Sequence, residues 1–236
     1  SNTEIVTVKV NPTPKLKTTT TPSAICSGDA FQYTPTSEVT GATFNWSRKT
    51  KVGISNAESA GIGSINEILI NTTSSPITVE YEYVLNTVAV NCPNIQKVFV
   101  VVNPTPILTS LTPLVQCSGS TFTFTPTSSI DPGSRFTWQR DAVYGISNLG
   151  ASGTYDPSIT GSAISPAEIL VDTLTTAVNV PYTFTVIKSS TGCSSTQVVT
   201  MVVKPVPVVS KIITTICSGS TFSAVPTKVP AGTVYS

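Results

Sequence analysis

The chain has 236 residues, of which 39% are hydrophobic and 11% are charged, and its 13 basic and 12 acidic side chains give a formal net charge of +1. A nearly neutral chain without a basic block lacks the electrostatic footprint of a nucleic-acid-binding protein, and its hydrophobic content is too high for a disordered one. Because the chain contains no histidine, it lacks the commonest general base and metal ligand, and we expect no enzyme activity, no metal and no cofactor.

Composition also predicts the fold class. Thr, Ser, Val and Pro dominate the chain, and the β-branched Thr and Val favour strands over helices. No stretch shows the three-to-four-residue apolar spacing of an amphipathic helix, so we predict an all-β protein. The longest apolar runs, such as "VFVVV" (98–102), are far shorter than the ~20 residues of a spanning helix, so we expect no membrane span in this segment.

The chain is organised as tandem repeats. One segment occurs as "AICSGDAFQYTPTS" (24–37), "VQCSGSTFTFTPTS" (115–128) and "TICSGSTFSAVPTK" (215–228), and "IVTVKVNPTP" (5–14) matches "KVFVVVNPTP" (97–106). In chain order, we predict the last strand of a preceding repeat at 1–14, complete repeats at 15–106 and 107–207, and the start of a further, truncated repeat at 208–236. We expect the residue that follows Ser236 in the parent protein to be Trp, because "TVYS" aligns with "TFNW" and "RFTW".

Each complete repeat shows the same succession of elements. An alternating strand follows the cysteine segment; next come a Trp strand ("TFNWSR", 43–48; "RFTWQR", 135–140), a Gly- and Ser-rich middle, an "EIL" strand and a closing hairpin. About seven short strands separated by turns indicate an immunoglobulin-like β-sandwich. The "NPTP" and "KPVP" joints restrict φ and remove backbone donors, so we predict short, stiff Pro-rich linkers between the sandwiches.

Two residue pairs recur at matched positions of these repeats. Trp46 and Trp138 lie in the middle of alternating strands, so we predict core tryptophans; the alternative is a pair of sugar-stacking platforms. Glu67 and Glu168 head the "EIL" strands, where we expect an exposed or edge-pairing role. The other acidic residues are scattered, and the joints carry Lys, which disfavours a calcium site.

The cysteines lack the spacing of a metal or redox motif. No CxxC pair exists, so we expect structural disulfides in an exported protein. Pairing within each repeat would join Cys26 to Cys92 and Cys117 to Cys193, and would leave Cys217 for a partner outside this segment.

The expected strand directions favour a different pairing. The first cysteine of a repeat precedes its second strand and the second cysteine follows its sixth, so the two lie at opposite poles, roughly 25 Å apart. A disulfide requires Cα atoms about 4.4–6.8 Å apart. We therefore prefer a Cys26–Cys193 bond across the joint, with Cys92 bonded to the preceding repeat and Cys117 and Cys217 to following ones; the pairing within repeats remains the alternative.

The combined pattern resembles a known group of proteins. "ICSG…FNW…NCPN…VFVVVNPTP" and "QCSG…FTW…TGCSS…VVTMVVKPVP" are similar to the PKD-like and immunoglobulin-like repeats of very large Bacteroidota surface proteins. Such proteins are typically exported by the type IX secretion system, and the best known are mobile adhesins of gliding motility. The resemblance implies an extracellular, cell-surface location and no catalytic residues. It also implies that "DTL" (172–174) fits an O-glycosylation pattern with the glycan on Thr173.

These features predict structural spacer repeats of a long surface filament or adhesin, which acts in cell adhesion or gliding motility. The expected partners are neighbouring repeats of the same polypeptide and surface polysaccharide or other cell-surface proteins. The alternative is an array of carbohydrate-binding modules on a secreted polysaccharide-degrading protein. Its candidate glycan contacts are Tyr144 and Tyr155, which lie in the variable middle of the second repeat.

Overall fold

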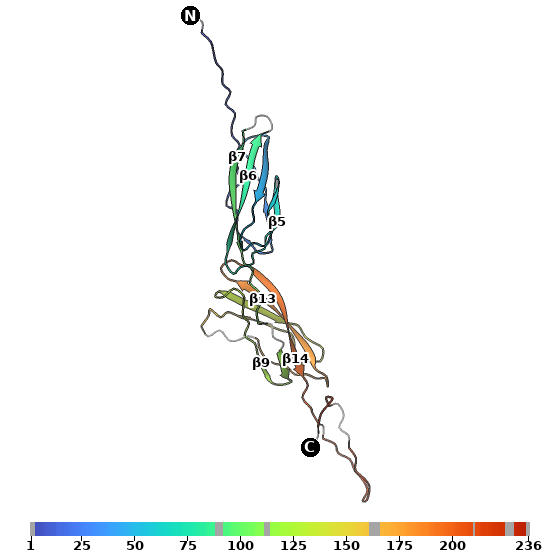
Figure 1. The fold of residues 1–236 in the computed structure, drawn as a ribbon. Coiled ribbons are helices and arrows are strands. Elements are labelled where there is room, and N and C mark those ends of the chain that lie inside the picture. Colours follow the sequence, from blue (N-terminus) through green and yellow to red (C-terminus); the bar gives the residue numbers. More distant parts are fainter. Residues whose placement is uncertain are drawn as a thin grey trace. The chain divides into compact units, whose positions relative to one another are not determined.

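The computed structural model describes residues 3–87, 92–110, 114–160, 166–209, 211–224 and 229–234. The chain divides into two compact units, Ser1–Thr105 and Pro106–Ser236, called unit 1 and unit 2 below. Every regular element in the described residues is a β-strand (Figure 1), which confirms the prediction of an all-β protein. The described residues contain no helix with the length and apolar character of a membrane span.

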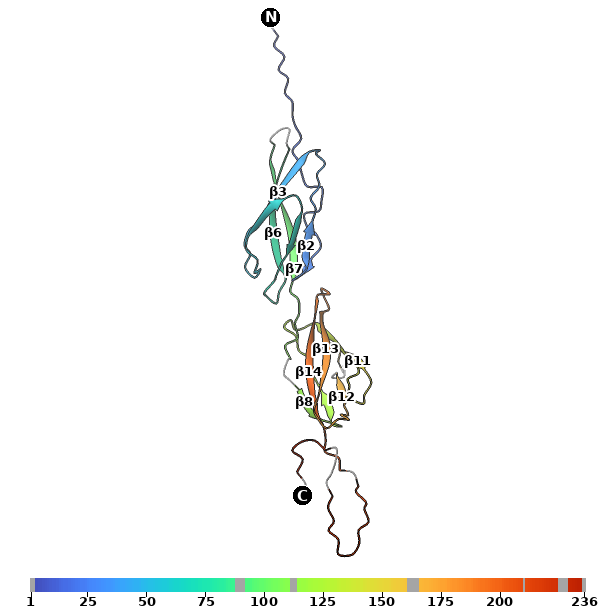
Figure 2. The ribbon, with the colours of Figure 1, turned by 90° about the vertical axis from the view of Figure 1, so that its right-hand side faces the viewer.

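Unit 1 is a sandwich of a five-stranded and a two-stranded sheet (Figure 2). Its strands are β1 (Ile25–Cys26), β2 (Ala30–Tyr33), β3 (Ala42–Arg48), β4 (Ser59–Ile62), β5 (Ile65–Ile68), β6 (Ile77–Thr87) and β7 (Asn94–Asn103). The larger sheet has the order β1-β7-β6-β3-β4, with β1 parallel to β7 and the other neighbours antiparallel. β2 and β5 form the smaller sheet.

The period-two pattern of the sequence produces the core of unit 1. Along β6, Tyr81 and Tyr83 are fully buried, and along β2 the alternating Phe31 and Tyr33 point to the same face. The two sheets meet through these rings, with centroids 5.3 Å apart for Phe31 and Tyr81 and 5.7 Å apart for Tyr33 and Tyr83. Aromatic packing between the faces thus joins the sheets into one sandwich.

Unit 2 repeats this topology. Its strands are β8 (Leu114–Cys117), β9 (Thr121–Thr123), β10 (Ser134–Arg140), β11 (Ala151–Tyr155), β12 (Ala167–Ile169), β13 (Val178–Lys188) and β14 (Ser194–Lys204). The larger sheet has the order β11-β10-β13-β14-β8, which is the strand order of unit 1 read from the opposite edge, and β9 pairs with β12. The inter-sheet contacts are also equivalent, with Phe122 5.6 Å from Tyr182 and Phe124 5.1 Å from Phe184.

Both tryptophans lie in these cores. Trp46 is 8% exposed and its ring centroid is 5.8 Å from that of Tyr81; Trp138 is 7% exposed and lies 5.7 Å from Tyr182. The indole of Trp46 packs so closely over β4 that a Cβ on Gly61 would lie 2.7 Å from it. This contact explains a glycine inside that strand.

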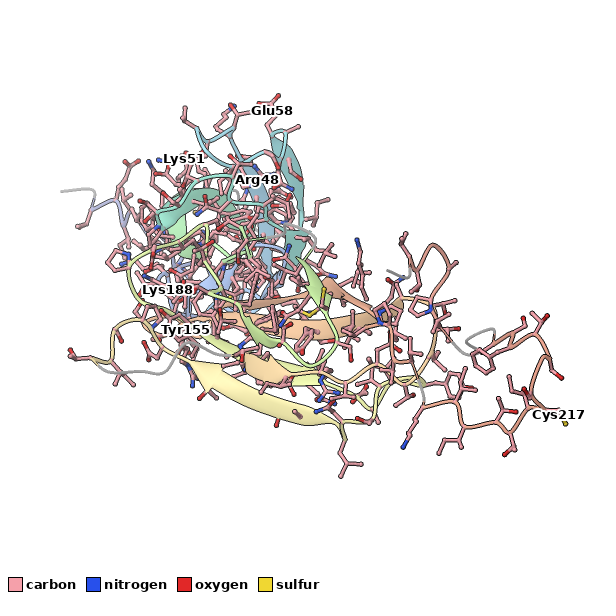
Figure 3. The ribbon with its side chains drawn as sticks, turned by 90° about the horizontal axis from the view of Figure 1, so that it is seen from below. Arg48, Lys51, Glu58, Tyr155, Lys188 and Cys217 are labelled. Atoms are coloured by element: carbon pink, nitrogen blue, oxygen red, sulfur yellow. The ribbon has the colours of Figure 1, made fainter. Side chains whose placement is uncertain are left out.

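The described residues outside the two sandwiches form no strands. Residues 3–10 are extended and exposed (Figure 1), and residues 211–224 are exposed and contain a turn at Ser218 and Gly219. Cys217 lies in this second segment, away from the strands (Figure 3). Residues 1–2, 210, 225–228 and 235–236 lie outside the described residues. The assignments of 1–14 to a preceding repeat and of 208–236 to a further one stay predictions.

Candidate functional site

A buried arginine stands at the end of the Trp strand in unit 1. Alternation along β3 places Arg48 on the same face as Trp46, and 1% of its side chain is exposed. Its Nε and Nη2 atoms donate hydrogen bonds to the two carboxylate oxygens of Glu67 at 3.0 and 3.1 Å, and Nη2 also donates to the Ala57 carbonyl at 2.6 Å. The Tyr81 hydroxyl donates to Glu67 Oε2 at 2.5 Å. The network links β3, β5 and β6, and therefore both sheets.

Unit 2 contains the same network. Arg140 at the end of β10 donates from Nε and Nη2 to the oxygens of Glu168 at 3.0 and 2.8 Å, and from Nη2 to the Leu149 carbonyl at 2.7 Å. The Tyr182 hydroxyl donates to Glu168 Oε2 at 2.5 Å. A bidentate guanidinium–carboxylate pair with a tyrosine donor is therefore common to both units.

The position of the glutamates overturns our expectation of an exposed or edge-pairing role. Only 16% of the Glu67 side chain and 14% of the Glu168 side chain are exposed. In β5, Glu67 alternates with the exposed Asn66 and Ile68, so it shares the inner face with Ile65. A carboxylate on this face needs a partner, and the matched arginine supplies it.

The electrostatics of the network keep its glutamate ionised and its tyrosine protonated. Burial by itself would raise the pKa of Glu67, but the hydrogen bonds from Arg48 and Tyr81 outweigh it and hold that pKa below its usual value. Burial and the neighbouring carboxylate raise the pKa of Tyr81, so its hydroxyl stays a donor. The pKa of Glu168 is lowered and the pKa of Tyr182 is raised for the same reasons. The paired charges have an architectural role, because they face each other inside the sandwich.

A second polar site lies at the corner between β5 and β6, and it differs between the units. In unit 1, Asn71 Nδ2 donates to the carbonyls of Ser75 at 2.8 Å and Val102 at 2.9 Å. In unit 2 the matched residue is Asp172, whose Oδ1 accepts from the backbone N–H of Leu174 at 2.8 Å. Its Oδ2 is buried without a hydrogen-bond partner.

The strand register separates the two cysteines of each unit. Cys26 lies opposite Asn103 at the end of β7, whereas Cys92 precedes the first residue of β7, Asn94. The length of β7 sets a separation of roughly 30 Å, far beyond disulfide reach. Unit 2 has the same arrangement, with Cys117 opposite Lys204 at the end of β14 and Cys193 just before its start.

The cysteines also differ in oxidation state. Cys92, Cys117 and Cys217 carry free thiols. Cys26 and Cys193 are disulfide-bonded cysteines. Among the described residues, no cluster of three or more His, Cys, Asp or Glu side chains could hold a metal ion.

The candidate glycan residues occupy different environments. Tyr144 is 89% exposed in the loop between β10 and β11. Tyr155 lies instead in β11, half-buried, with its ring stacked on Phe136 at 6.1 Å, so the ring is not an open stacking platform. Thr173 is exposed, and its backbone N–H and hydroxyl both donate to the Gly145 carbonyl, at 2.8 and 3.1 Å.

Shallow hollows lie on the outer faces of the larger sheets. A hollow of about 280 Å³ in unit 1 is lined by charged and polar residues: Ser47, Lys49, Thr50, Lys51, Glu80 and Glu82. Lys51 and Glu58 project at the rim of this unit, whereas Arg48 lies among its packed side chains (Figure 3). A hollow of about 360 Å³ in unit 2 is lined mainly by uncharged side chains: Thr137, Trp138, Gln139, Ser152, Gly153, Thr154, Thr183 and Thr185.

The "NPTP" segment is hydrogen-bonded to the exit of unit 1. The backbone N–H of Ser27 donates to the Asn103 carbonyl at 2.7 Å, and the Thr105 hydroxyl donates to the Ser27 carbonyl at 2.7 Å. Ser27 directly follows Cys26, so the same turn holds both the disulfide cysteine and the departing chain. Val206 replaces this threonine after unit 2 and has no hydroxyl to donate.

Hydrogen bonds also fix the entry to each unit. In unit 2, the Ser195 hydroxyl donates to the Pro106 carbonyl, and the Leu108 N–H donates to Gln197 Oε1. The matched bonds in unit 1 run from Asn94 Nδ2 to the Pro14 carbonyl and from the Leu16 N–H to Gln96 Oε1. Thr105 and Pro106 are consecutive, so the chain passes directly from one hydrogen-bonded residue to the next.

Comparison with known proteins finds a family match within unit 1. The model of the PKD-like domain family matches residues 23–106, which include every strand of unit 1. A search of the curated proteins found no match.

Several solved structures are similar to this chain over most of its length. The titin I-band fragment I67-I69 is 13% identical, with 86% of this chain and 69% of that one covered at a TM-score of 0.33. Extracellular domains 3-5 of Drosophila OTK are 12% identical over 82% and 61%, with a TM-score of 0.33. The fibronectin(III)-like modules of Clostridium thermocellum CbhA are 12% identical over 81% and 94%, with a TM-score of 0.27. The match to the PKD-like family model covers unit 1, and unit 2 repeats the topology of that unit.

Proposed function

We propose that the chain is a run of structural spacer repeats in a long extracellular surface filament or adhesin. The observation that carries this proposal is the joint at Thr105 and Pro106, where each residue is hydrogen-bonded to its own unit and no free residue separates them. A short linker that contains prolines restricts the motion between successive sandwiches. Repeats of this kind add length without a change of fold.

The proposal includes a Cys26–Cys193 disulfide across the joint. Cys26 lies opposite Asn103, and Cys193 is two residues from Ser195, which binds the Pro106 carbonyl. Asn103 and Pro106 are three residues apart, so at most ~10 Å of chain separates the two attachment points. In a longer array, Cys92 would bond to the preceding repeat, and Cys117 and Cys217 to following repeats.

The motif resemblance supports the more specific part of the proposal, which is export by a type IX system and a role in adhesion or gliding motility. PKD-like domains are structural modules, which agrees with buried polar networks that serve the fold. The exposed Thr173 would carry an O-glycan in the native host. Mass spectrometry of the protein isolated from its host tests this site, and an unmodified peptide around Thr173 would remove it from the proposal.

Peptide mapping under non-reducing conditions tests the cross-link. The oxidised chain should yield a linked peptide that contains Cys26 and Cys193, together with alkylated Cys92, Cys117 and Cys217. A linked Cys26–Cys92 peptide would refute the cross-joint arrangement.

NMR relaxation tests the stiffness of the joint. With a restricted joint, the backbone amides of both units report one common, anisotropic rotational diffusion tensor. Independent correlation times, each that of a domain of ~100 residues, would contradict the spacer function. The measurement is repeated after reduction, to separate the effect of the disulfide from that of the hydrogen-bonded joint.

A further inference from the structure

The outer face of the larger sheet in unit 2 carries an ordered row of threonines. Cross-strand pairing places Thr154 of β11 beside Thr137 of β10, Thr137 beside Thr185 of β13, and Thr185 beside Thr196 of β14. We call these four residues the threonine row. A parallel second row contains Ser152, Gln139, Thr183 and Val198.

The geometry of the sheet makes this face a regular array. Adjacent strands lie about 4.8 Å apart and successive outward residues on one strand about 6.7 Å apart. Thr154 and Thr196 are exposed, Thr137 and Thr185 are half-buried, and the hydroxyls of Thr185 and Thr196 are 3.2 Å apart. Threonine has few χ1 rotamers, so its hydroxyl and methyl groups are largely preorganised. The hollow of about 360 Å³ lies over this array.

The fold does not require this row, because unit 1 has the same topology with different residues there. The matched positions are Ile62, Asn45, Val84 and Ile95, and those of the second row are Ala60, Ser47, Glu82 and Lys97. Cross-strand threonine pairs contribute to sheet stability, but the row of unit 1, with one asparagine and three apolar residues, serves the same fold. The hydroxyl array is therefore a property of unit 2 alone.

The uncharged polar side chains of this face favour an uncharged, hydroxyl-rich ligand. The two rows contain no charged side chain, and at their edge Gln139 Nε2 donates to the Asp141 carboxylate at 2.8 Å. The threonine and serine hydroxyls both donate and accept, which complements a chain of uncharged hydroxyl groups. Beyond Gln139, the loop between β10 and β11 exposes Tyr144, whose ring can stack on the apolar face of a sugar. Val52, at the matched position of unit 1, has no ring. An anionic polymer would gain no ion pair within these rows.

We propose that the threonine row, the second row and Tyr144 form a binding face for a neutral polysaccharide. This inference goes beyond the spacer function, because a spacer needs no ligand, and either one can fail without the other. One such face would bind weakly through a few hydrogen bonds, and several repeats that carry the face in one filament would bind with higher avidity.

Affinity electrophoresis of the full chain tests the face. The probes are gels that contain laminarin, mannan, dextran or hydroxyethylcellulose, with alginate as an anionic comparison. We expect retardation by at least one neutral polymer and none by alginate. The row variant takes the residues of unit 1, as Thr154→Ile, Thr137→Asn, Thr185→Val and Thr196→Ile, and should weaken binding about tenfold.

Two controls make the outcome decisive. Tyr144→Val, which takes the residue of unit 1, should also weaken binding, whereas Thr78→Ala on the outer face of unit 1 should not. Thermal unfolding of each variant shows whether unit 2 remains folded; if the row variant unfolds, the single substitutions Thr137→Asn and Thr185→Val replace it. The proposal would be overturned if none of the four neutral polymers retarded the chain, or if alginate alone did. It would also be overturned if the folded row variants and Tyr144→Val bound as strongly as the starting protein.

Discussion

Units 1 and 2 share a topology and a buried Arg–Glu–Tyr network, but they differ at the corner before β6 and β13 and on their outer faces. Each arginine contacts its glutamate through two nitrogens and binds a backbone carbonyl from the following loop. At the corner, an amide in unit 1 is replaced by a carboxyl group in unit 2. The comparison separates what the sandwich requires from what a repeat can vary: the network holds the two sheets together, whereas the corner and outer face accept substitutions.

Breaking the shared network should have the largest effect. Arg140→Ala leaves the Glu168 carboxylate buried without its cation, and we expect a loss of about 3–5 kcal/mol in the stability of unit 2. Arg48→Ala should do the same to unit 1. Urea unfolding followed by tryptophan fluorescence distinguishes the units, because Trp46 and Trp138 report one unit each when the other is replaced by Phe.

The exposed Lys49→Ala substitution is the control for the charge change, and it should leave both transitions within about 0.5 kcal/mol of the starting protein. Equal effects of Lys49→Ala and Arg48→Ala would contradict the structural role of the network.

Exchanging the corner residues should move the stabilities of the units in opposite directions. Asp172→Asn supplies a donor like that of Asn71, which binds two carbonyl groups, so unit 2 should gain about 1 kcal/mol. Asn71→Asp removes both donated bonds and should cost unit 1 about 1–3 kcal/mol. The same single-tryptophan unfolding experiment measures both changes. Destabilisation of unit 2 by Asp172→Asn would show that the carboxyl group has a role that an amide cannot fill.

Acid should weaken both units through their glutamates. The pKa values of Glu67 and Glu168 are lower in the folded chain than in the unfolded chain. Each carboxylate therefore stabilises the fold above its unfolded pKa, near 4.3, and this contribution disappears as the pH falls through the folded pKa. We expect both melting temperatures to fall as the pH drops below about 5. Glu168→Gln should flatten the profile of unit 2 but leave that of unit 1 unchanged; a profile of unit 2 that keeps its acid slope would assign the effect to other groups.

The smallest effect is expected at the joint. Thr105→Val removes the hydrogen bond to Ser27 and takes the residue found at Val206 after unit 2. Unit stabilities should change by less than about 1 kcal/mol, because one partly exposed hydrogen bond is lost. The amides of residues 103–107 should show increased fast motion in ¹⁵N relaxation. Unchanged relaxation would mean that the prolines alone restrict the joint.

Parts of the candidate sites were predictable from the sequence. The repeated "WSR" and "WQR", the "EIL" strands and the matched tyrosines place Arg, Glu and Tyr at equivalent positions of a chain with few charges. A comparison of the two repeats could therefore have found the network, but the glutamates were expected at the surface because their arginine partners come from another strand. Opposite poles were correctly expected for the two cysteines of a repeat, since strand direction follows from strand order.

By itself, the sequence determined the all-β class, the self-similarity of the two units and the buried tryptophans, because composition, alternation and self-similarity are local properties of the chain. Only the tertiary structure decided which polar groups meet: the guanidinium with its glutamate, the amide with two carbonyls, and four threonines in one row. Those contacts depend on the register of strands that are far apart in the sequence, and a shift of one residue would turn every side chain to the opposite face.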